Sequence, residues 1–335
     1  MTGAPQVSVV VRSFNRVPTL CDLLTALLDQ RHDAFEIVVV EQSTDVPDEA
    51  AERLADLARD PRIHLLRRPP LGGPGARNAG VRAARGEILV FIDDDDLPVG
   101  RDWLAEHLAN YADPRCLGVS GRHRQGPHDE PTPSYARRAL TRCMGFSPLL
   151  KLPTTYVRHT TRIAPVAAVH GTNGSLRRSV IERFGGWDED TTLEDETSLA
   201  LRVQAGKRPD EYFAFDPIPQ VIRGLGVVGG LDKRFVTAGR FYVRLLDFVH
   251  TILGRYFPAR VAVLYPVYAA VAYGWTVGWI WVEASAYRRR AWPHKLAATV
   301  LFTVSAPFQI IRAIIWSRSK RQAAMTPERM RSATP

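Results

Sequence analysis

Apolar and polar residues alternate along the first third of the chain in stretches whose spacing switches between that of strands and that of helices. Short runs of Val, Ile, Leu and Phe predict buried strands, and longer stretches with apolar residues three and four positions apart predict helices. The predicted strands are Val7–Arg12, Glu36–Val40, Ile63–Leu66 and Ile88–Ile92, and the predicted helices are Pro18–Gln30, Asp48–Arg59 and Gly75–Ala84. This βαβα order predicts an α/β domain with a Rossmann-like, mostly parallel sheet flanked by helices.

Clusters of polar residues follow three of the predicted strands at the point where each strand ends. Ser13–Arg16 follows the first strand, Glu41–Asp45 follows the second, and Asp93–Asp96 follows the last. In sheets of this kind, ligands bind beyond the carboxyl ends of the strands. The sequence therefore predicts a binding site at this edge of the sheet.

The four consecutive aspartates Asp93–Asp96 carry the strongest chemical signal. Like charges at a buried edge repel each other unless a cation or hydrogen-bond donors offset them, and carboxylate oxygens suit Mg²⁺ or Mn²⁺. The preceding segment Gly72–Gly80 combines glycines, which let the backbone approach a ligand, with Arg77, whose guanidinium suits phosphate. Together they predict a site for a nucleoside diphosphate held partly through a metal. For the aspartates alone, an acidic helix cap is the structural alternative.

Residues 121–170 differ in composition, with many prolines and basic residues and an apolar patch at Phe146–Leu152. Such a stretch is typical either of a loop that covers an acceptor site or touches a membrane, or of disorder. Regular patterns return at Gly171–Arg178, and Leu193–Arg202 is acidic at its start and then apolar at helical spacing. The acidic start either stabilises a helix N-terminus or supplies a general base.

Composition narrows the class of protein. The 335 residues are 45% hydrophobic and 24% charged, which is ordinary for a globular protein with a sizeable core. Cys21, Cys116 and Cys143 form no CxxC or CxxH cluster, which favours a reducing compartment over a disulfide or zinc framework. The N-terminus has no basic-then-apolar signal, so we expect an unprocessed protein on the cytoplasmic side.

The net charge of +9 is concentrated near the C-terminus. Between Ser285 and Arg321 there is no acidic residue, and eight basic residues flank apolar stretches: Arg288, Arg289, Arg290, Lys295, Arg312, Arg318, Lys320 and Arg321. Basic residues in this setting indicate an anionic membrane surface. No nucleic-acid-binding motif is visible, so we expect no nucleic-acid partner.

Two apolar stretches in the C-terminal third are long enough to cross a bilayer, Val261–Val282 and Leu296–Trp316. We expect Pro307 to break the second stretch in its middle. A spanning hairpin would place Arg288–Arg290 outside, against the positive-inside tendency, whereas helices lying in the membrane interface avoid that conflict. Interfacial helices, spanning helices and a soluble helical pair packed on a partner are the three alternatives.

The order of these motifs resembles the family 2 glycosyltransferases over roughly residues 6–225. The motifs that carry the resemblance are Val7–Arg16, Ala76–Asn78, Asp93–Asp96, Gly185–Glu189 and Glu194–Asp195. The resemblance implies a GT-A fold and inverting transfer from a nucleotide-activated sugar, most often UDP-linked, with a divalent metal. Together with this resemblance, the apolar C-terminal stretches predict three parts: a nucleotide-sugar-binding half at 1–115, an acceptor-binding and catalytic-base half at 116–230, and C-terminal helices, membrane-associated or spanning, at 231–335.

The resemblance also assigns roles to single residues. Asp195 is the expected general base with Glu196 as the alternative, Asp95 or Asp96 would hold the metal, and Trp187 and Asp188 would contact the acceptor. The residues expected to bind the nucleotide sugar are Ser13, Asn15, Arg16, Glu41, Arg77, Asp93 and Asp94.

Three positions depart from the family pattern. The turn at Glu41–Ser43 is one residue shorter than the usual acidic turn Asp-Asp-Gly-Ser, and Ser198 replaces the second Asp of the usual base motif. A His that often follows the last strand is missing, and Arg223 stands near its place, where it would meet the diphosphate as a fixed cation. The Gln-x-x-Arg-Trp motif of processive synthases is also absent, so we expect non-processive transfer.

The leading hypothesis is an inverting, metal-dependent glycosyltransferase at the cytoplasmic face of the cell membrane. Its acceptor would be a lipid-linked or cell-envelope glycan, with polyprenyl phosphate as the rival acceptor. A nucleotidyltransferase would share the sheet and the carboxylates but usually has a Gly-rich loop with a Lys after the first strand, where this chain has Ser13–Arg16. A non-catalytic scaffold of the same fold is the remaining alternative.

Overall fold

A computed structural model describes residues 6–124, 145–154, 164–191, 195–223, 238–282 and 292–324. The chain divides into two compact units. The first lies within residues 1–227, and the second comprises residues from Val228 onward together with Pro148–Lys151 and Glu189–Asp195. Most of the predicted covering loop within 121–170 falls outside the described residues.

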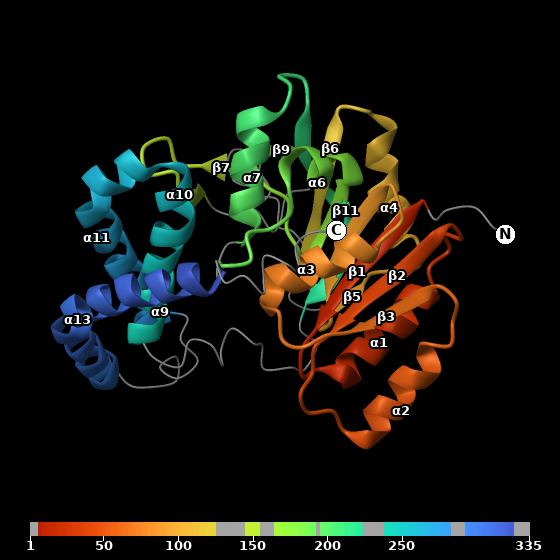
Figure 1. Ribbon diagram of the computed structural model, residues 1–335, viewed down its shortest axis with the longest axis horizontal. Coiled ribbons are helices and arrows are strands. Elements are labelled where there is room, and N and C mark those ends of the chain that lie inside the picture. The colour runs from red at the N-terminus through yellow and green to blue at the C-terminus, as the bar shows by residue number, and fades with distance from the viewer. Residues whose placement is uncertain are drawn as a thin grey trace. The chain divides into compact units, whose positions relative to one another are not determined.

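The first unit is built on one large mixed sheet (Figure 1). Its strands have the order β3-β2-β1-β4-β10-β6-β11-β5, with β9 pairing on β11, and a separate ribbon joins β7 to β8. The pairs β2–β3, β1–β2, β1–β4 and β6–β11 are parallel, and β10 is antiparallel to both of its neighbours. The strands are β1 Val7–Ser13, β2 Phe35–Glu41, β3 Ile63–Arg67, β4 Ile88–Asp93, β5 Asp96–Pro98, β6 Cys116–Arg124, β7 Gly145–Phe146, β8 Pro153–Thr154, β9 Ala164–Val166, β10 Asn173–Arg177 and β11 Tyr212–Arg223.

Helices pack on both faces of this sheet, which confirms the predicted α/β class. They are α1 Val17–Leu28, α2 Asp48–Leu57, α3 Gly72–Ala83, α4 Trp103–Ala109, the 3₁₀ turn η1 Asn110–Ala112, α6 Arg178–Phe184 and α7 Asp195–Gly206. Val9 and Val11 of β1 belong to one core with the leucines of α1, whereas Val10 belongs to a second core with Phe91 of β4. Burial on both faces explains why the strand runs are almost wholly apolar.

The helix predicted at Gly75–Ala84 begins earlier in the structure, because α3 starts at Gly72 and includes Gly72 and Gly73 in its first turn. Gln42, just after β2, anchors this start by accepting a hydrogen bond from the Leu71 N–H at 2.7 Å. A Cβ at Gly73 would overlap the guanidinium of Arg12. The glycine therefore lets a helix with low intrinsic propensity begin close against the sheet edge.

A buried polar network links α4 to β10. His107 contacts Ser175 Oγ through Nδ1 and Asn173 Oδ1 through Nε2, both at 3.0 Å, and Trp103 Nε1 donates to the same Asn173 oxygen at 2.9 Å. Because the Asn173 amide nitrogen donates to two backbone carbonyls, its oxygen must accept, and His107 carries its proton on Nε2. Complete burial lowers the pKa of His107 to about 4, so the ring is neutral in the folded protein.

We expect His107→Gln to reduce the acid sensitivity of folding. Below pH 6.5 the unfolded chain binds a proton at His107 that the folded chain excludes until about pH 4, so stability falls as the pH drops through this window. This difference in the pKa of His107 between the unfolded and folded states corresponds to about 3 kcal/mol of folding stability. Urea unfolding of both proteins at several pH values checks this, and equal pH dependence would show that His107 is not the group responsible.

From Ala238 onward, the described residues of the second unit are almost all helical. The helices are α9 Ala238–Phe248, the π-helical turn η2 Val249–Leu253, α10 Gly254–Tyr256, α11 Pro258–Val282 and α13 Trp292–Ala324. Within the described part of the chain, α11 and α13 contain the two segments, Pro258–Trp281 and Trp292–Ser319, that are long and apolar enough to cross a membrane, judged by length and composition alone.

The expected break at Pro307 was wrong, since α13 continues through it. Proline removes only its own N–H donor, and the neighbouring turns keep their hydrogen bonds. Phe302, before the proline, and Ala313, after it, also belong to one core with residues of α9 and α11, which holds the helix together on both sides of the proline.

Candidate active site

The predicted polar clusters meet at one edge of the sheet. Ser13 of β1 is in register with Glu41 of β2, and Arg12 is in register with Asp93 of β4. The antiparallel β10 begins at the same edge, where Asn173 pairs with Ile92. The polar clusters at the ends of three parallel strands therefore meet at one edge of the sheet, as the sequence predicted, and the start of β10 lies at the same edge. Ligand binding at this edge stays a prediction.

Two arginines offset the charge of the aspartate run. Arg12 Nε donates to Asp93 Oδ1 at 2.9 Å, and Arg16 forms ion pairs with Asp94, at 2.6 Å, and with Asp95. Burial raises the pKa of Asp94 to about 7, although the nearby Arg16 guanidinium favours its charged form. Arginine and aspartate side chains therefore alternate in space at the end of β4. Asp96 is the first residue of the next strand, β5.

The carboxylates differ in how open they are to an incoming ligand. The side chains of Asp93 and Asp95 are 12% and 14% exposed, whereas Asp94 and Asp96 are almost wholly buried. Among the described residues, no three His, Cys, Asp or Glu side chains gather closely enough to enclose one ion. The donor set fits a metal held by one or two carboxylates and completed by phosphate and water oxygens, the usual manner of Mg²⁺.

The loops after β1 and β2 are fastened to each other. Asn15 has a positive φ of 54°, and its N–H donates to Ser43 Oγ at 2.7 Å while its side-chain oxygen accepts from the Thr44 N–H at 2.9 Å. Glu41 accepts from the Ser43 N–H at 2.6 Å and is buried. These two residues thus shape the loop beside the aspartates, and their contact with a nucleotide stays a prediction.

Arg77 of α3 lies in a buried polar contact with the helix predicted to carry the base. Its Nη2 atom is 3.3 Å from Glu196 Oε1, and its guanidinium lies 5.8 Å from the ring centre of Trp187. Glu196 also accepts a hydrogen bond from the Gly171 N–H at 3.1 Å. The predicted site residues Arg77 and Glu196 are therefore in direct contact, and Glu196 is also bonded to the turn that precedes β10.

Gly171 is required by this packing, and we expect Gly171→Ala to displace Arg77. A Cβ at this position would overlap the guanidinium, which is held on its other sides by Glu196 and Trp187. We expect a loss of about 1–3 kcal/mol of stability, measured by urea unfolding. Gly278→Ala is the control, because a Cβ there meets nothing within 4 Å; equal effects of the two changes would contradict the account.

The two residues predicted to contact the acceptor lie at the edge of the second core. Trp187 is 5% exposed and packs edge-to-face on Phe91 at 5.0 Å, and Asp188 pairs with Arg202 at 2.7 Å. The Asn78 side chain, which the sequence did not single out for this role, fixes Trp187 by bonding both its backbone N–H and its carbonyl. Contact of Trp187 and Asp188 with an acceptor stays a prediction.

Some predicted residues fall outside what the structure describes, and others were missed. Helix α7 begins at Asp195, but the side chains of Asp195 and Arg223 are not among those described. Arg12 was missed as a site residue, although its place next to the last position of β1 puts it level with Asp93. A strand-register argument would have found it.

Comparison with known proteins identifies relatives for this arrangement. The model of the family described as Glycosyl transferase family 2 matches residues 8–185. The chain is 26% identical over 215 residues to the "Probable glycosyltransferase YdaM" of Bacillus subtilis, covering 61% of this chain and 47% of that protein. It is 30% identical over 212 residues to the "O-antigen biosynthesis protein RfbC" of Myxococcus xanthus, covering 61% and 16%. The chain thus spans less than half the length of these curated relatives.

Solved structures support the same fold. The mannosyltransferase PcManGT from Pyrobaculum calidifontis, in complex with GDP-Man and Mn²⁺, aligns with a TM-score of 0.53 at 21% identity, covering 97% of this chain and 89% of that one. GalNAc-T7 with UDP, GalNAc and Mn²⁺ aligns with a TM-score of 0.52 at 15% identity, covering 67% and 44%. These similarities confirm the predicted GT-A-like fold.

Proposed function

The chain belongs to glycosyl transferase family 2, and we propose that it transfers a single sugar from a nucleoside diphosphate donor to a hydroxyl group of a lipid-linked or cell-envelope glycan. The observation that carries the proposal is the cluster of Arg12, Arg16 and the aspartates Asp93–Asp95 at the ends of β1 and β4. The structural neighbours bind GDP-Man or UDP, each with Mn²⁺, which supports a nucleotide-linked donor. A UDP-linked sugar is our first candidate.

Asp93 and Asp95, whose carboxylates are less buried than those of Asp94 and Asp96, are the residues that would hold a divalent metal, with Asp95 favoured over Asp96. The metal would offset the negative charge that grows on the departing diphosphate. Arg16, already paired with Asp95, and Arg77, on α3, would supply further positive charge there. Asn15 and Glu41 would hold the adjoining loop in the shape that receives the nucleotide.

Inverting transfer also needs a carboxylate that removes the proton of the acceptor hydroxyl. Glu196 is engaged with Arg77 and Gly171, so we assign it to positioning and assign the base to Asp195, the first residue of α7. We expect Asp195→Asn to lower turnover about 10²–10⁴-fold without weakening donor binding. Parallel measurement of turnover and donor Kd checks this, and full activity of Asp195→Asn would exclude it as the base.

A lipid-linked or cell-envelope acceptor is supported by the name of the RfbC relative and by the two long apolar helices α11 and α13. A direct test incubates the purified protein with a panel of nucleotide sugars and with glycolipid extract, polyprenyl phosphate or neither. We expect one donor to release its nucleoside diphosphate only when glycolipid and Mn²⁺ or Mg²⁺ are present. Release with polyprenyl phosphate alone would reassign the acceptor, and no release with any donor would favour the non-catalytic scaffold.

A further inference from the structure

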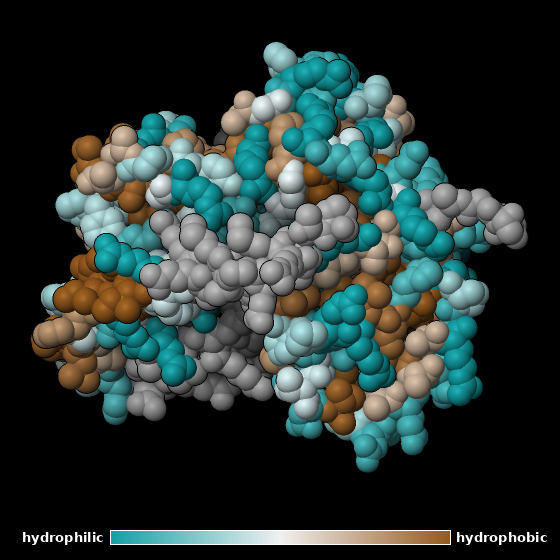
Figure 2. All heavy atoms as spheres, in the orientation of Figure 1, coloured by the Kyte–Doolittle hydropathy of each residue, from teal (hydrophilic) through white to brown (hydrophobic). Residues whose placement is uncertain are grey.

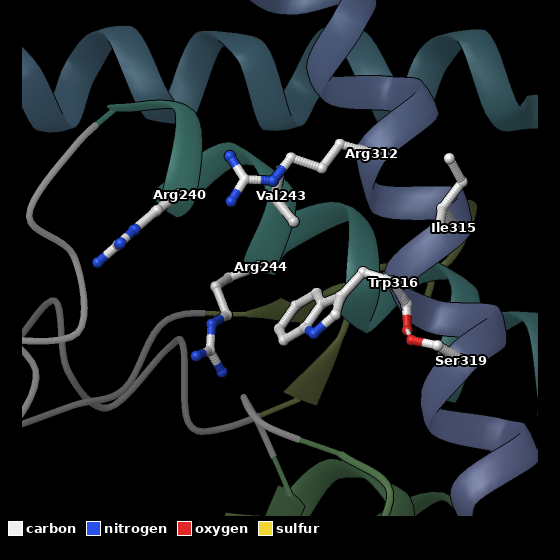
Figure 3. Close-up of a pocket in the computed structure, with 7 residues that line it drawn as sticks. All are labelled: Arg240, Val243, Arg244, Arg312, Ile315, Trp316 and Ser319. Carbon is white, nitrogen blue, oxygen red and sulfur yellow. Dashed lines mark hydrogen bonds between the residues drawn. The ribbon is translucent and has the colours of Figure 1, made fainter.

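A pocket of about 520 Å³ lies in the helical unit between α9 and α13 (Figure 3). It is lined by Arg240, Val243 and Arg244 of α9 and by Arg312, Ile315, Trp316 and Ser319 of α13. On each helix the lining residues follow the spacing of one helical face. The pocket is therefore formed by the facing side chains of these two helices.

The pocket lining combines three arginines with the apolar side chains of Val243, Ile315 and Trp316. Arg312 reaches from α13 toward α9 in front of Val243, and Arg240 and Arg244 extend from α9 (Figure 3). The guanidinium of Arg244 lies 4.7 Å from the ring centre of Trp316. None of the described lining residues is acidic, and Asp247, one turn farther along α9, is buried and accepts a hydrogen bond from Ser317 at 2.9 Å.

An exposed apolar stripe on α13 leads to this pocket. Leu301, Val304, Phe308, Ile311 and Ile315 recur at spacings of three and four and are 58–72% exposed. Hydrophobic residues accordingly gather on the surface over α13 in Figure 2. Ile315 belongs both to the stripe and to the pocket lining, so the apolar stripe ends at the pocket that the arginines line.

We propose that this pocket binds the phosphate headgroup of a membrane lipid whose apolar chain, or the bilayer around it, covers the stripe. Guanidinium groups match phosphate oxygens in geometry and charge, and a phosphomonoester or diphosphate presents more free oxygens and more charge to such a pocket than a phosphodiester does. A soluble phosphate could also bind the arginines but would leave the stripe in water, which is why a lipid is the better occupant. This inference goes beyond sugar transfer and concerns the helical unit alone.

The test measures binding of the full chain to phosphatidylcholine vesicles that contain either phosphatidic acid, a phosphomonoester, or phosphatidylglycerol, a phosphodiester, at matched surface charge. Arg312→Gln is compared with Arg318→Gln, since both arginines are exposed on α13 but only Arg312 lines the pocket. We expect tighter binding to phosphatidic acid, and a loss of roughly tenfold for Arg312→Gln on those vesicles. Arg318→Gln should lower binding to both vesicle types alike and by less. Arg240→Gln should repeat the effect of Arg312→Gln from the opposite helix.

Other outcomes would overturn the proposal. Equal losses of vesicle binding for Arg312→Gln and Arg318→Gln on both vesicle types would show that the protein binds through its general surface charge and not through the pocket. Binding of free pyrophosphate that depends on Arg312, without any Arg312-dependent binding to vesicles, would assign the pocket to a soluble phosphate. Because nucleotide binding is not used as a readout, failure here leaves the proposed transferase function unaffected.

Discussion

Asp95→Asn is expected to abolish metal-stimulated donor binding and to lower turnover about 10³-fold. Asp95 lies two residues after the end of β4, is 14% exposed, and pairs with Arg16. Asparagine keeps the shape of this side chain while removing the charge that a divalent cation requires. Folding should change by only about 1 kcal/mol, because the Arg16 pair with Asp95 is partly open to solvent. Calorimetric donor binding with and without Mn²⁺, together with urea unfolding, checks both parts.

Asp102→Asn is the matched control for this change, since Asp102 is an exposed aspartate that pairs with Arg31 at the surface. It should leave donor binding and turnover unchanged. Metal-dependent binding that survives Asp95→Asn but is lost in Asp96→Asn would move the metal ligand to the buried member of the run.

Arg77→Gln is expected to lower both stability and activity. The guanidinium is almost wholly buried beside Glu196 and Trp187, and removing one partner of a buried ion pair costs about 3 kcal/mol. If Arg77 also stabilises the departing diphosphate, turnover should fall about 10²–10³-fold. Urea unfolding and the rate of nucleoside diphosphate release measure the two effects separately.

The double variant Arg77→Gln/Glu196→Gln separates these contributions. Neutralising both partners should restore part of the lost stability, because no uncompensated carboxylate then remains beside the glutamine. Turnover should stay low, since the positive charge is still missing. Recovery of turnover along with stability would show that Arg77 acts through folding alone.

The fold was predictable because its signals are local. The buried run Ile88–Ile92 and the aspartates after it specify a strand and its end within a few residues. The alternation of strands and helices then predicts parallel pairing of the first strands. The C-terminal helices were likewise visible from their apolar stretches, except that packing on α9 and α11 keeps α13 continuous through Pro307.

The meeting of the polar clusters at one edge of the sheet was predictable, but the contacts among their side chains were not. The pairing of Arg12 with Asp93 depends on the register of β1 with β4, and the contact of Arg77 with Glu196 depends on where α7 packs after an irregular stretch. Neither is a local property of the sequence. Burial of Trp187 against Phe91 is of the same kind, because a motif position does not reveal which side of the backbone faces the core.

The most direct test of the account is calorimetric titration of the purified protein with UDP, GDP and other nucleoside diphosphates, with and without Mn²⁺, repeated for Asp95→Ala. We expect one nucleotide to bind in a metal-dependent manner to the wild-type protein, and we expect this binding to disappear in the variant. Absence of binding for every nucleotide, with the protein folded, would contradict the transferase assignment.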